Sequence, residues 1–335
     1  MEEKLVKFNK KRIDELFEKF NGKNIVIVGD LMLDVYIWGK VGRISPEAPV
    51  PVVEVEEESY RLGGAANVGL NIKSLGGNPI LVGVIGYDRE GTILDALMKE
   101  NDFIRDGIIL DEERPTTVKT RIIAHSQHVV RVDKEDKKDI TEEMENKILT
   151  FLENQKSSID AIIFEDYNKG VLTKSLIHRV VDFARRKNII VTVDPKFDNF
   201  FEYKNVTVFK PNRKETEDAL QMKIDSEEKV IEAGKKLKEI LQPEYLLITR
   251  GDKGMTLFSS DSRIDSIPTR ARKVADVSGA GDTVIATLTI ALASGAEIRE
   301  AATIANLAAG LVCEEVGIVP IDKMNLYNHL IEDKN

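Results

Sequence analysis

Short apolar runs alternate with amphipathic segments along almost the whole chain, and few folds accommodate that alternation. The first run, Asn24–Gly29, is continuous and bounded by turn-forming residues, which is typical of a strand buried on both faces. Similar runs occur at Pro79–Val84, Ala161–Phe164, Ile189–Val193, Val206–Phe209 and Tyr245–Thr249. Helical patterns precede or separate them, at Phe8–Phe20, Gly64–Leu75, Gly91–Glu100, Glu142–Gln155, Lys174–Lys187 and Glu227–Leu241. This alternation predicts an α/β fold with a central, mostly parallel sheet and helices on both faces.

Two β-branched segments interrupt the alternation, because no helical pattern separates their strands. They cover about residues 35–58 and 114–133, and we expect antiparallel strands that stand apart from the main sheet as a small lid. The exposed edges of such a lid must be blunted or paired. Pro49, Pro51 and the acidic run Glu56–Glu58 are residues that keep other strands from pairing with an exposed edge. Pairing of the lids in a homodimer is the other solution. No linker divides the chain, so we expect one domain over residues 1–335.

Composition excludes several classes of protein. The net charge is −9 and the basic residues are scattered, which argues against a nucleic-acid partner. The one cysteine, Cys313, has no disulfide partner in the chain, and this favours a reducing cytoplasm. The N-terminal residues lack the apolar core of a signal peptide. The longest apolar stretch, Thr283–Ala293, is too short to span a bilayer, so we expect no membrane contact and a cytoplasmic location.

The segment Asp276–Thr283 places glycines and a carboxylate at the start of an expected helix, Asp282–Ala293. Gly279 and Gly281 allow backbone N–H groups to converge on one point, and the helix dipole makes that point attractive to an anion. A carboxylate repels anions, so Asp282 suits a different task, namely accepting a proton from a hydroxyl while the amides stabilise a phosphoryl group. The alternative is a glycine turn in which Asp282 caps the helix.

Other polar residues follow the strands at the edge where ligands bind in open parallel sheets. Asp34 follows the first strand and could accept hydrogen bonds from sugar hydroxyls, or cap a loop. The pair Gly63-Gly64 opens a helix that carries Asn67 one turn in. Further strand ends carry the segments Glu165–Gly170, Asp194–Lys196, Lys210–Glu215 and Thr249–Gly254. No P-loop, no Gly-x-Gly-x-x-Gly after the first strand and no zinc-ligand cluster occurs, which excludes three common kinds of site.

Asn212 and Glu215 lie three residues apart at the start of a helix. They could hold nucleotide phosphates or a hydrated Mg²⁺, which typically binds one or two carboxylates and several waters. A capping box is an equally good interpretation. Thr249, Gly251 and Gly254 suit either a nucleotide phosphate or a hairpin turn.

Together, Gly63-Gly64…Asn67, Asn212…Glu215 and Asp276…Gly279-Ala280-Gly281-Asp282 resemble the ribokinase-like, or PfkB, carbohydrate kinases from about Ile25 to Pro320. The stretch from Arg43 to Val53, with Asp166–Gly170 and Asp194–Lys196, resembles the kinase domain of the bacterial heptose enzymes of lipopolysaccharide core synthesis. The resemblance implies ATP-dependent phosphorylation of D-glycero-β-D-manno-heptose 7-phosphate at O1.

The resemblance also implies a role for each matching residue. Asp282 would be the general base, and Gly279, Ala280 and Gly281 would supply the anion hole. ATP would contact Asn212, Arg213, Lys214, Glu215, Thr249, Gly251, Gly254 and Asn306, with Mg²⁺ at Glu215 through water and a monovalent cation at Asp276. The sugar would contact Asp34, Gly63, Gly64, Asn67, Asp166, Lys196 and Arg43.

A substrate phosphate requires a basic partner, and Arg43, Lys196, Arg121 and Arg131 are the candidates, although each could equally be a solvated surface charge. The heptose enzymes often carry a second, nucleotidyltransferase domain with a His-x-Gly-His motif, which this sequence lacks. We therefore expect the bisphosphate as product, with a separate phosphatase and nucleotidyltransferase acting downstream. Two alternatives stay open: the same fold acting on another sugar or a nucleoside, and a non-catalytic sugar or nucleotide sensor.

Overall fold

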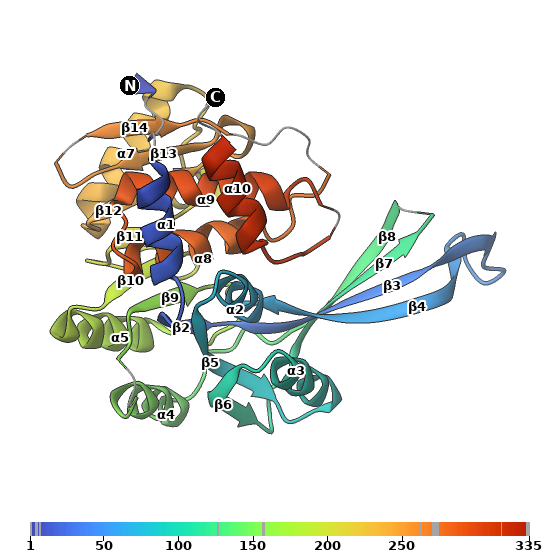
Figure 1. Cartoon of the computed structure of the whole chain (residues 1–335). Helices are drawn as coiled ribbons and strands as arrows, with labels where there is room; N and C mark the ends of the chain where they lie inside the picture. The colour runs from blue at the N-terminus through green and yellow to red at the C-terminus, as the bar shows by residue number, and fades with distance from the viewer. Residues whose placement is uncertain are drawn as a thin grey trace.

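A long twisted sheet forms the centre of the body, and a four-stranded arm projects from it (Figure 1). The computed structural model describes residues 2–3, 6, 8–125, 127–155, 158–261, 263–269, 275–315 and 317–332. Within these ranges ten strands make up the central sheet, in the order β1-β14-β13-β12-β11-β10-β9-β2-β5-β6. Its strands are β1 Glu2–Glu3, β2 Asn24–Gly29, β5 Asn78–Gly86, β6 Ile104–Asp111, β9 Ala161–Glu165, β10 Ile190–Asp194, β11 Val208–Phe209, β12 Tyr245–Thr249, β13 Met255–Phe258 and β14 Ile264–Ile267.

Most neighbouring strands of this sheet are parallel, as the alternation of strands and helices predicts. β2 lies between β5 and β9 and pairs with both in parallel, and its residues from Ile25 to Gly29 are buried. The antiparallel pairs are β12 with β13 and β13 with β14. The prediction of an α/β fold with a central, mostly parallel sheet is confirmed.

Helices cover both faces of the sheet. They are α1 Lys10–Lys19, α2 Ala65–Ser74, α3 Arg89–Glu100, α4 Glu142–Glu153, α5 Lys174–Lys187, α6 Arg213–Leu220, α7 Glu227–Leu241, α8 Ala280–Ala293, α9 Ile298–Val312 and α10 Lys323–Glu332, with a 3₁₀ turn at Gly251–Lys253. One apolar core joins the sheet to α1, α2, α3, α8, α9 and α10. A second core joins its other face to α4, α5 and α7. No helix in the described ranges is long and apolar enough to cross a membrane.

The arm consists of β3 Leu31–Ile44, β4 Pro51–Gly64, β7 Thr117–Ala124 and β8 Gln127–Lys134, in the order β4-β3-β7-β8. These strands contain the two segments expected to form a lid. The expected arrangement was antiparallel throughout, and it is wrong for one pair: β3 and β7 are parallel. The intervening chain from α2 to β6 returns to the body before β7 begins, so β7 leaves the body in the same direction as β3. β3 is buried at its start and exposed at its end.

Candidate active site

Asp282 lies in the first turn of α8, not at its cap. The helix begins at Ala280, two residues earlier than expected, and Gly279 precedes it with φ +79°, a left-handed conformation that favours glycine. The Asp282 side chain bonds no helix amide. Its Oδ2 accepts a hydrogen bond from Asn67 Nδ2 at 2.5 Å, and its Oδ1 accepts one from the Tyr167 hydroxyl at 3.0 Å. The interpretation of Asp282 as a helix cap is therefore wrong.

Burial sets the proton affinity of Asp282. The residue is 6% exposed, and burial, with the nearby charge of Asp194, raises the pKa of its carboxyl to about 6. The hydrogen bonds from Asn67 and Tyr167 and the charge of Lys196 act in the opposite direction. A carboxylate with a pKa close to the working pH is suited to general-base catalysis. The geometry and the proton affinity therefore agree with the role that the sequence predicts.

Two adjoining cavities meet at the start of α8. The polar one, of about 510 Å³, is lined by Asp282, Gly279 and Gly281, by Tyr167, and by the ends of three neighbouring strands. The other, of about 360 Å³, is largely apolar and reaches Val277, Val284 and Asn306. The amides of Gly281 and Asp282 lie in the first helical turn, where no preceding carbonyl of the helix can bond them. The pair of cavities suits a polyphosphate joined to a planar, apolar base.

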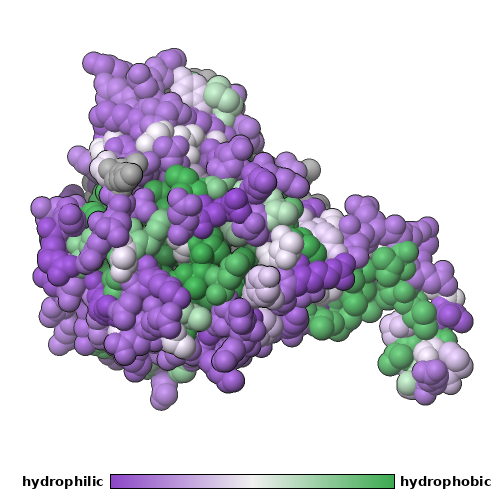
Figure 2. Space-filling model, turned by 90° about the horizontal axis from the view of Figure 1, so that it is seen from below, coloured by the Kyte–Doolittle hydropathy of each residue, from purple (hydrophilic) through white to green (hydrophobic). Residues whose placement is uncertain are grey.

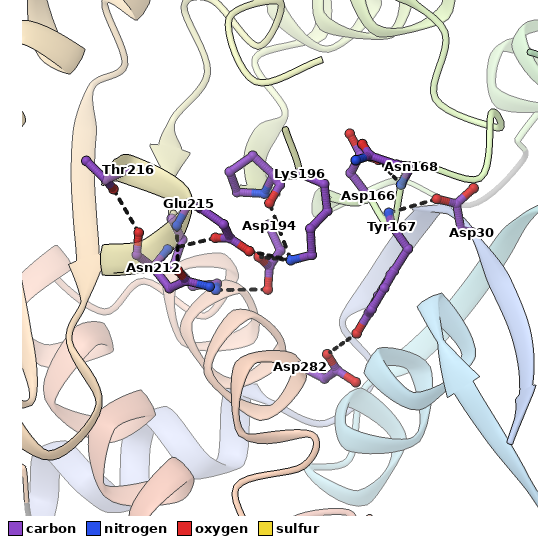
Figure 3. Close-up of polar contacts among 12 residues, drawn as sticks. Asp30, Asp166, Tyr167, Asn168, Asp194, Lys196, Asn212, Glu215, Thr216 and Asp282 are labelled. Carbon is purple, nitrogen blue, oxygen red and sulfur yellow. Dashed lines mark hydrogen bonds and ion pairs between the residues drawn. The ribbon is translucent and has the colours of Figure 1, made fainter. Parts of the chain in front are cut away.

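The nucleotide residues predicted from sequence come together at these cavities. Asn212, Arg213, Lys214 and Glu215 line the polar one, Gly254 and Asn306 line the apolar one, and Thr249 and Gly251 line both. The capping box is also present. Asn212 Oδ1 accepts a hydrogen bond from the Glu215 amide, and Glu215 Oε2 accepts one from the Asn212 amide, each at 2.8 Å. Figure 3 shows Lys196 reaching between Glu215 and Asp194; its Nζ lies 2.5 Å from Glu215 Oε1.

The predicted sugar residues form a second group at the base of the arm. Asp34, in β3, pairs with Arg121 of β7 at 2.5 Å. Gly63 lies directly against the Asp34 carboxylate, so any side chain at this position would collide with it. Gly64 has φ +56° and caps α2, whose third residue is Asn67. Through Asn67, this group is joined to Asp282.

Several site residues are not predicted from the sequence as binding residues. The ammonium of Lys119 lies 4.6 Å from the centre of the Tyr167 ring, and burial lowers its pKa. Lys169 Nζ lies 2.8 Å from Glu135, and Lys210 Nζ lies 2.8 Å from Asp194. Lys169 and Lys210 belong to strand-end segments that the sequence singles out, which is the signal that could have found them. Lys119 lies inside an ordinary β-branched run and carries no such signal.

Four predicted residues lie apart from these two groups or are already bonded within the fold. Arg43 is exposed at the outer end of β3, and Arg131 pairs with its neighbour Asp133 on β8. Asp166 is buried, and its carboxylate accepts hydrogen bonds from the Tyr203 hydroxyl at 2.6 Å and from the Asn168 amide at 2.8 Å. Asp276 accepts the amides of Ser278 and Gly317. Roles for these four in sugar, phosphate or cation binding stay predictions.

Residues 23–323 match the pfkB family of carbohydrate kinases. The chain belongs to this family. Similar curated proteins include the bifunctional protein HldE of Geobacter sulfurreducens, 41% identical over 96% of this chain, and that of Helicobacter pylori, 42% identical over 88%. The chain spans 66% and 64% of the lengths of these two relatives. The predicted membership of the PfkB family is confirmed, and with it the class of sugar phosphotransferases.

Solved PfkB-type structures share the fold. Phosphofructokinase-2 from Escherichia coli, in its tetrameric inhibited form, has a TM-score of 0.74 and 16% identity, covering 92% of this chain and 99% of its own. Ribokinase from Arabidopsis thaliana, complexed with ribose and ATP, has a TM-score of 0.71 and 17% identity, with the same coverage. At such identities the likeness establishes the fold and leaves the choice of sugar open.

Proposed function

We propose that this PfkB-family kinase transfers the γ-phosphoryl group of ATP to O1 of D-glycero-β-D-manno-heptose 7-phosphate. The heptose assignment is supported by the 40–44% identity to HldE proteins over most of this chain. Because the chain spans less than two thirds of the full length of most of these relatives, the proposal concerns the kinase reaction alone.

Asp282 and the start of α8 carry the chemistry. In the proposed step, Asp282 accepts the proton of the sugar hydroxyl while the hydroxyl oxygen bonds to the γ-phosphorus. The bond between that phosphorus and the bridging oxygen breaks, and ADP leaves with the electron pair. The amides of Gly281 and Asp282 stabilise charge on the transferring group, since they have no carbonyl partner within the helix.

A cationic group beside Asp34 supports a phosphorylated sugar. Arg121 and Lys119 project from β7, and Lys169 contributes to the electrostatic environment of Lys119. Lys119 is partly buried, and burial lowers the pKa of its ammonium although Asp34 and Asp133 act in the opposite direction, so a further anion beside it would stabilise its charged form. We assign the substrate phosphate to this group. Of the candidates drawn from the sequence, Arg121 belongs to it, whereas Lys196 lies on the nucleotide side.

The Mg²⁺ that accompanies ATP would contact Glu215 through water. Both Glu215 oxygens are already hydrogen-bonded, one to Lys196 and one to the Asn212 amide, which fits a water-mediated contact better than a direct one. When bound, Mg²⁺ neutralises charge on the β- and γ-phosphates. A monovalent cation near Asp276 is a further proposal. A phosphatase and a separate nucleotidyltransferase would act downstream on the bisphosphate.

A substrate panel tests the proposal. The purified protein is given ATP, Mg²⁺ and one of heptose 7-phosphate, the unphosphorylated heptose, fructose 6-phosphate, ribose or a nucleoside, and ADP release is measured. We expect the highest kcat/KM with heptose 7-phosphate and a product whose new phosphate is on C1 by ³¹P NMR. Preference for another acceptor would reject the heptose assignment, and sugar binding without turnover with any acceptor would favour a sensor.

The assignment of the substrate phosphate has its own test. Lys119→Met keeps the length of the side chain and removes its charge, so we expect KM for heptose 7-phosphate to rise at least about tenfold. KM for ATP should stay unchanged. Lys187→Met is the matched control, because Lys187 is exposed at the end of α5, outside the cationic group. An unchanged KM for the sugar phosphate in Lys119→Met would remove Lys119 from the site.

A further inference from the structure

Asp30 is a buried carboxylate to which the proposed reaction gives no role. It follows β2 directly, is 2% exposed, and lines neither of the two cavities at the start of α8. Its Oδ2 accepts hydrogen bonds from the backbone amides of Tyr167 at 2.7 Å and Lys169 at 3.1 Å. Its Oδ1 accepts one from the amide of Val171 at 3.3 Å. One side chain therefore holds the loop after β9 at three points.

The backbone conformation of this loop explains why it needs an acceptor. Asn168 has φ +55° and Gly170 has φ +79°, so left-handed residues alternate with the three residues whose amides Asp30 binds. A change of hand between successive residues turns their N–H groups toward the inside of a curve, and such curves commonly bind anions. Here the anion is the Asp30 carboxylate, which belongs to the protein itself.

The same loop carries one of the two groups that orient Asp282. The amide of Tyr167 is held by Asp30, and the hydroxyl of Tyr167 donates to Asp282 Oδ1 at 3.0 Å (Figure 3). Because the tyrosine ring is rigid, the position of the backbone at residue 167 determines where the hydroxyl meets Asp282. The carboxylate of Asp30 therefore acts on Asp282 through the length of Tyr167.

The backbone of Asp30 contacts the element that carries the second group. Its carbonyl accepts a hydrogen bond from the amide of Ala65 at 3.0 Å, and Ala65 is the first residue of α2. Asn67, two residues further along this helix, donates to Asp282 Oδ2. Residue 30 thus supports both donors to Asp282, Tyr167 through its side chain and Asn67 through its backbone.

We propose that Asp30 is a positioning residue for phosphoryl transfer, which holds the Tyr167 hydroxyl against Asp282. This proposal rests on the proposed role of Asp282 as the proton acceptor. A carboxylate suits the task because it only accepts hydrogen bonds. The amide of Asn, turned either way, would set its NH₂ group against at least one of the three backbone N–H groups. Misplacement of a reacting group by about 1 Å can cost about 10² in rate, so the loss of one anchor is expected to affect turnover.

Asp30→Asn tests this role, because it keeps the shape of the side chain and leaves the backbone contact with α2 in place. We expect kcat to fall at least about tenfold while KM for ATP stays unchanged. In a Tyr167→Phe background the hydroxyl is already absent, so the same substitution should lower kcat by less than about twofold. Turnover is measured with the acceptor that gives the highest activity in the substrate panel, so the result does not depend on which sugar that is.

Glu145→Gln is the matched control. Glu145 lies on α4, is 5% exposed, and accepts hydrogen bonds from the hydroxyls of Thr173 and Ser175 at the start of α5. It is thus another buried carboxylate that holds a nearby segment, but outside the site. Glu145→Gln and Asp30→Asn should both lower the Tm, because each leaves buried groups without an acceptor. Only Asp30→Asn should lower kcat.

An unchanged kcat in folded Asp30→Asn would overturn the proposal. Equal losses of kcat with and without the Tyr167 hydroxyl would also overturn it, because Asp30 would then act by another route. So would a loss of kcat in Glu145→Gln as large as that in Asp30→Asn, because destabilisation alone would account for both. If circular dichroism shows that Asp30→Asn does not fold, Asp30→Ser takes its place, since the smaller side chain leaves room for water at the loop amides.

Asp282→Asn separates this proposal from the proposed function. If Asp282→Asn loses activity while Asp30→Asn keeps it, only the positioning role of Asp30 is rejected. If both variants keep their activity, the role of Asp282 as the proton acceptor is rejected as well.

Discussion

Two uncharged donors hold Asp282, one on each carboxylate oxygen. Asn67 comes from the helix that follows the arm, and Tyr167 comes from the loop after β9. Neutral donors fix the orientation of a carboxylate without the large loss of basicity that an adjacent full positive charge would cause. Asp282 is therefore oriented and still basic, which is the combination that proton abstraction requires.

Asp282→Asn should lower kcat by about 10²–10⁴-fold, because it removes the group that accepts the proton. ATP affinity should change little, since the amides of the first α8 turn and the residues of α6 are retained. Turnover and ATP binding by calorimetry check both expectations. Asp102→Asn is the control, as the Asp102 side chain is 90% exposed. Near-normal turnover in Asp282→Asn would remove Asp282 from the catalytic role.

The activity should fall as the pH drops through about 6, because Asp282 has a pKa of about 6 and acts only when ionised. The Tyr167 hydrogen bond stabilises the ionised form, so Tyr167→Phe should raise this pKa. A hydrogen bond to a charged group contributes about 1.5 kcal/mol, equivalent to about one pH unit. The acid limb of kcat/KM against pH should therefore move upward by about that amount. An unmoved limb would show that Tyr167 does not influence the base.

At the scale of elements, tight packing between α7 and β13 fixes the position of β13. The first residue of this strand, Met255, lines the apolar cavity. Gly234 of α7 lies against the ring of Phe258, and a Cβ at this position would overlap that ring. Gly234→Ala should lower the free energy of unfolding by about 1–3 kcal/mol, because overpacking outweighs the better helix propensity of Ala. Urea denaturation measures the difference. Lys235→Ala, at an exposed neighbour, should change little, and a stabilised Gly234→Ala would contradict the packing argument.

The elements that the sequence predicts well are those with a single strong signal. β2, β9 and β10 are buried on both faces and read as continuous apolar runs. β6 is partly exposed and mixes charged with apolar residues, and β13 and β14 have four residues each, so no comparable run marks them. The start of α8 shifted by two residues because Gly279, not Asp282, turns the chain.

Site residues follow the same rule. Glycines and carboxylates at strand ends are visible in the sequence, and this is how Asp282, Asn67 and Asn212 could be predicted. The contact between Tyr167 and Asp282 joins residues 115 positions apart, and no local pattern encodes it. Neither oxygen of Glu165 has a hydrogen-bond partner among the described residues, and this can be recognised only when the residues around it have been placed in space.

At the scale of the whole molecule, the arm is the surface that we expect to bind another protein chain. Large apolar side chains are exposed along it, namely Ile44, Val50, Val55, Val129, Val130 and Val132. Figure 2 shows apolar surface on the projecting arm, away from the body. Exposed apolar strips of this kind mark interaction surfaces. We propose that two copies pair through their arms, which is the homodimer through the lid that the sequence analysis gives as the alternative to blunted edges.

Val130→Glu combined with Val132→Glu should convert a dimer into monomers, because the two residues lie on the same face of β8 and would bring four charges into the interface. Sedimentation velocity at micromolar concentration measures the mass. Met324→Glu is the control: Met324 is 59% exposed but belongs to α10, on the body. A monomeric wild type, or a double variant that stays dimeric, would reject the arm as the interface.

β3 begins in the core at Leu31, carries Asp34 and ends exposed at Ile44, and its pairing with β4 shifts register twice in the outer half, at Trp38/Gly39 and Val41/Arg43. Asp34, which we propose binds the sugar, is thus part of the same strand as the outer arm. A contact that reorients the base of the arm would also move Asp34 and its partner Arg121. Affinity for the sugar and association of the arms should therefore be thermodynamically linked, each changing the other by the same factor.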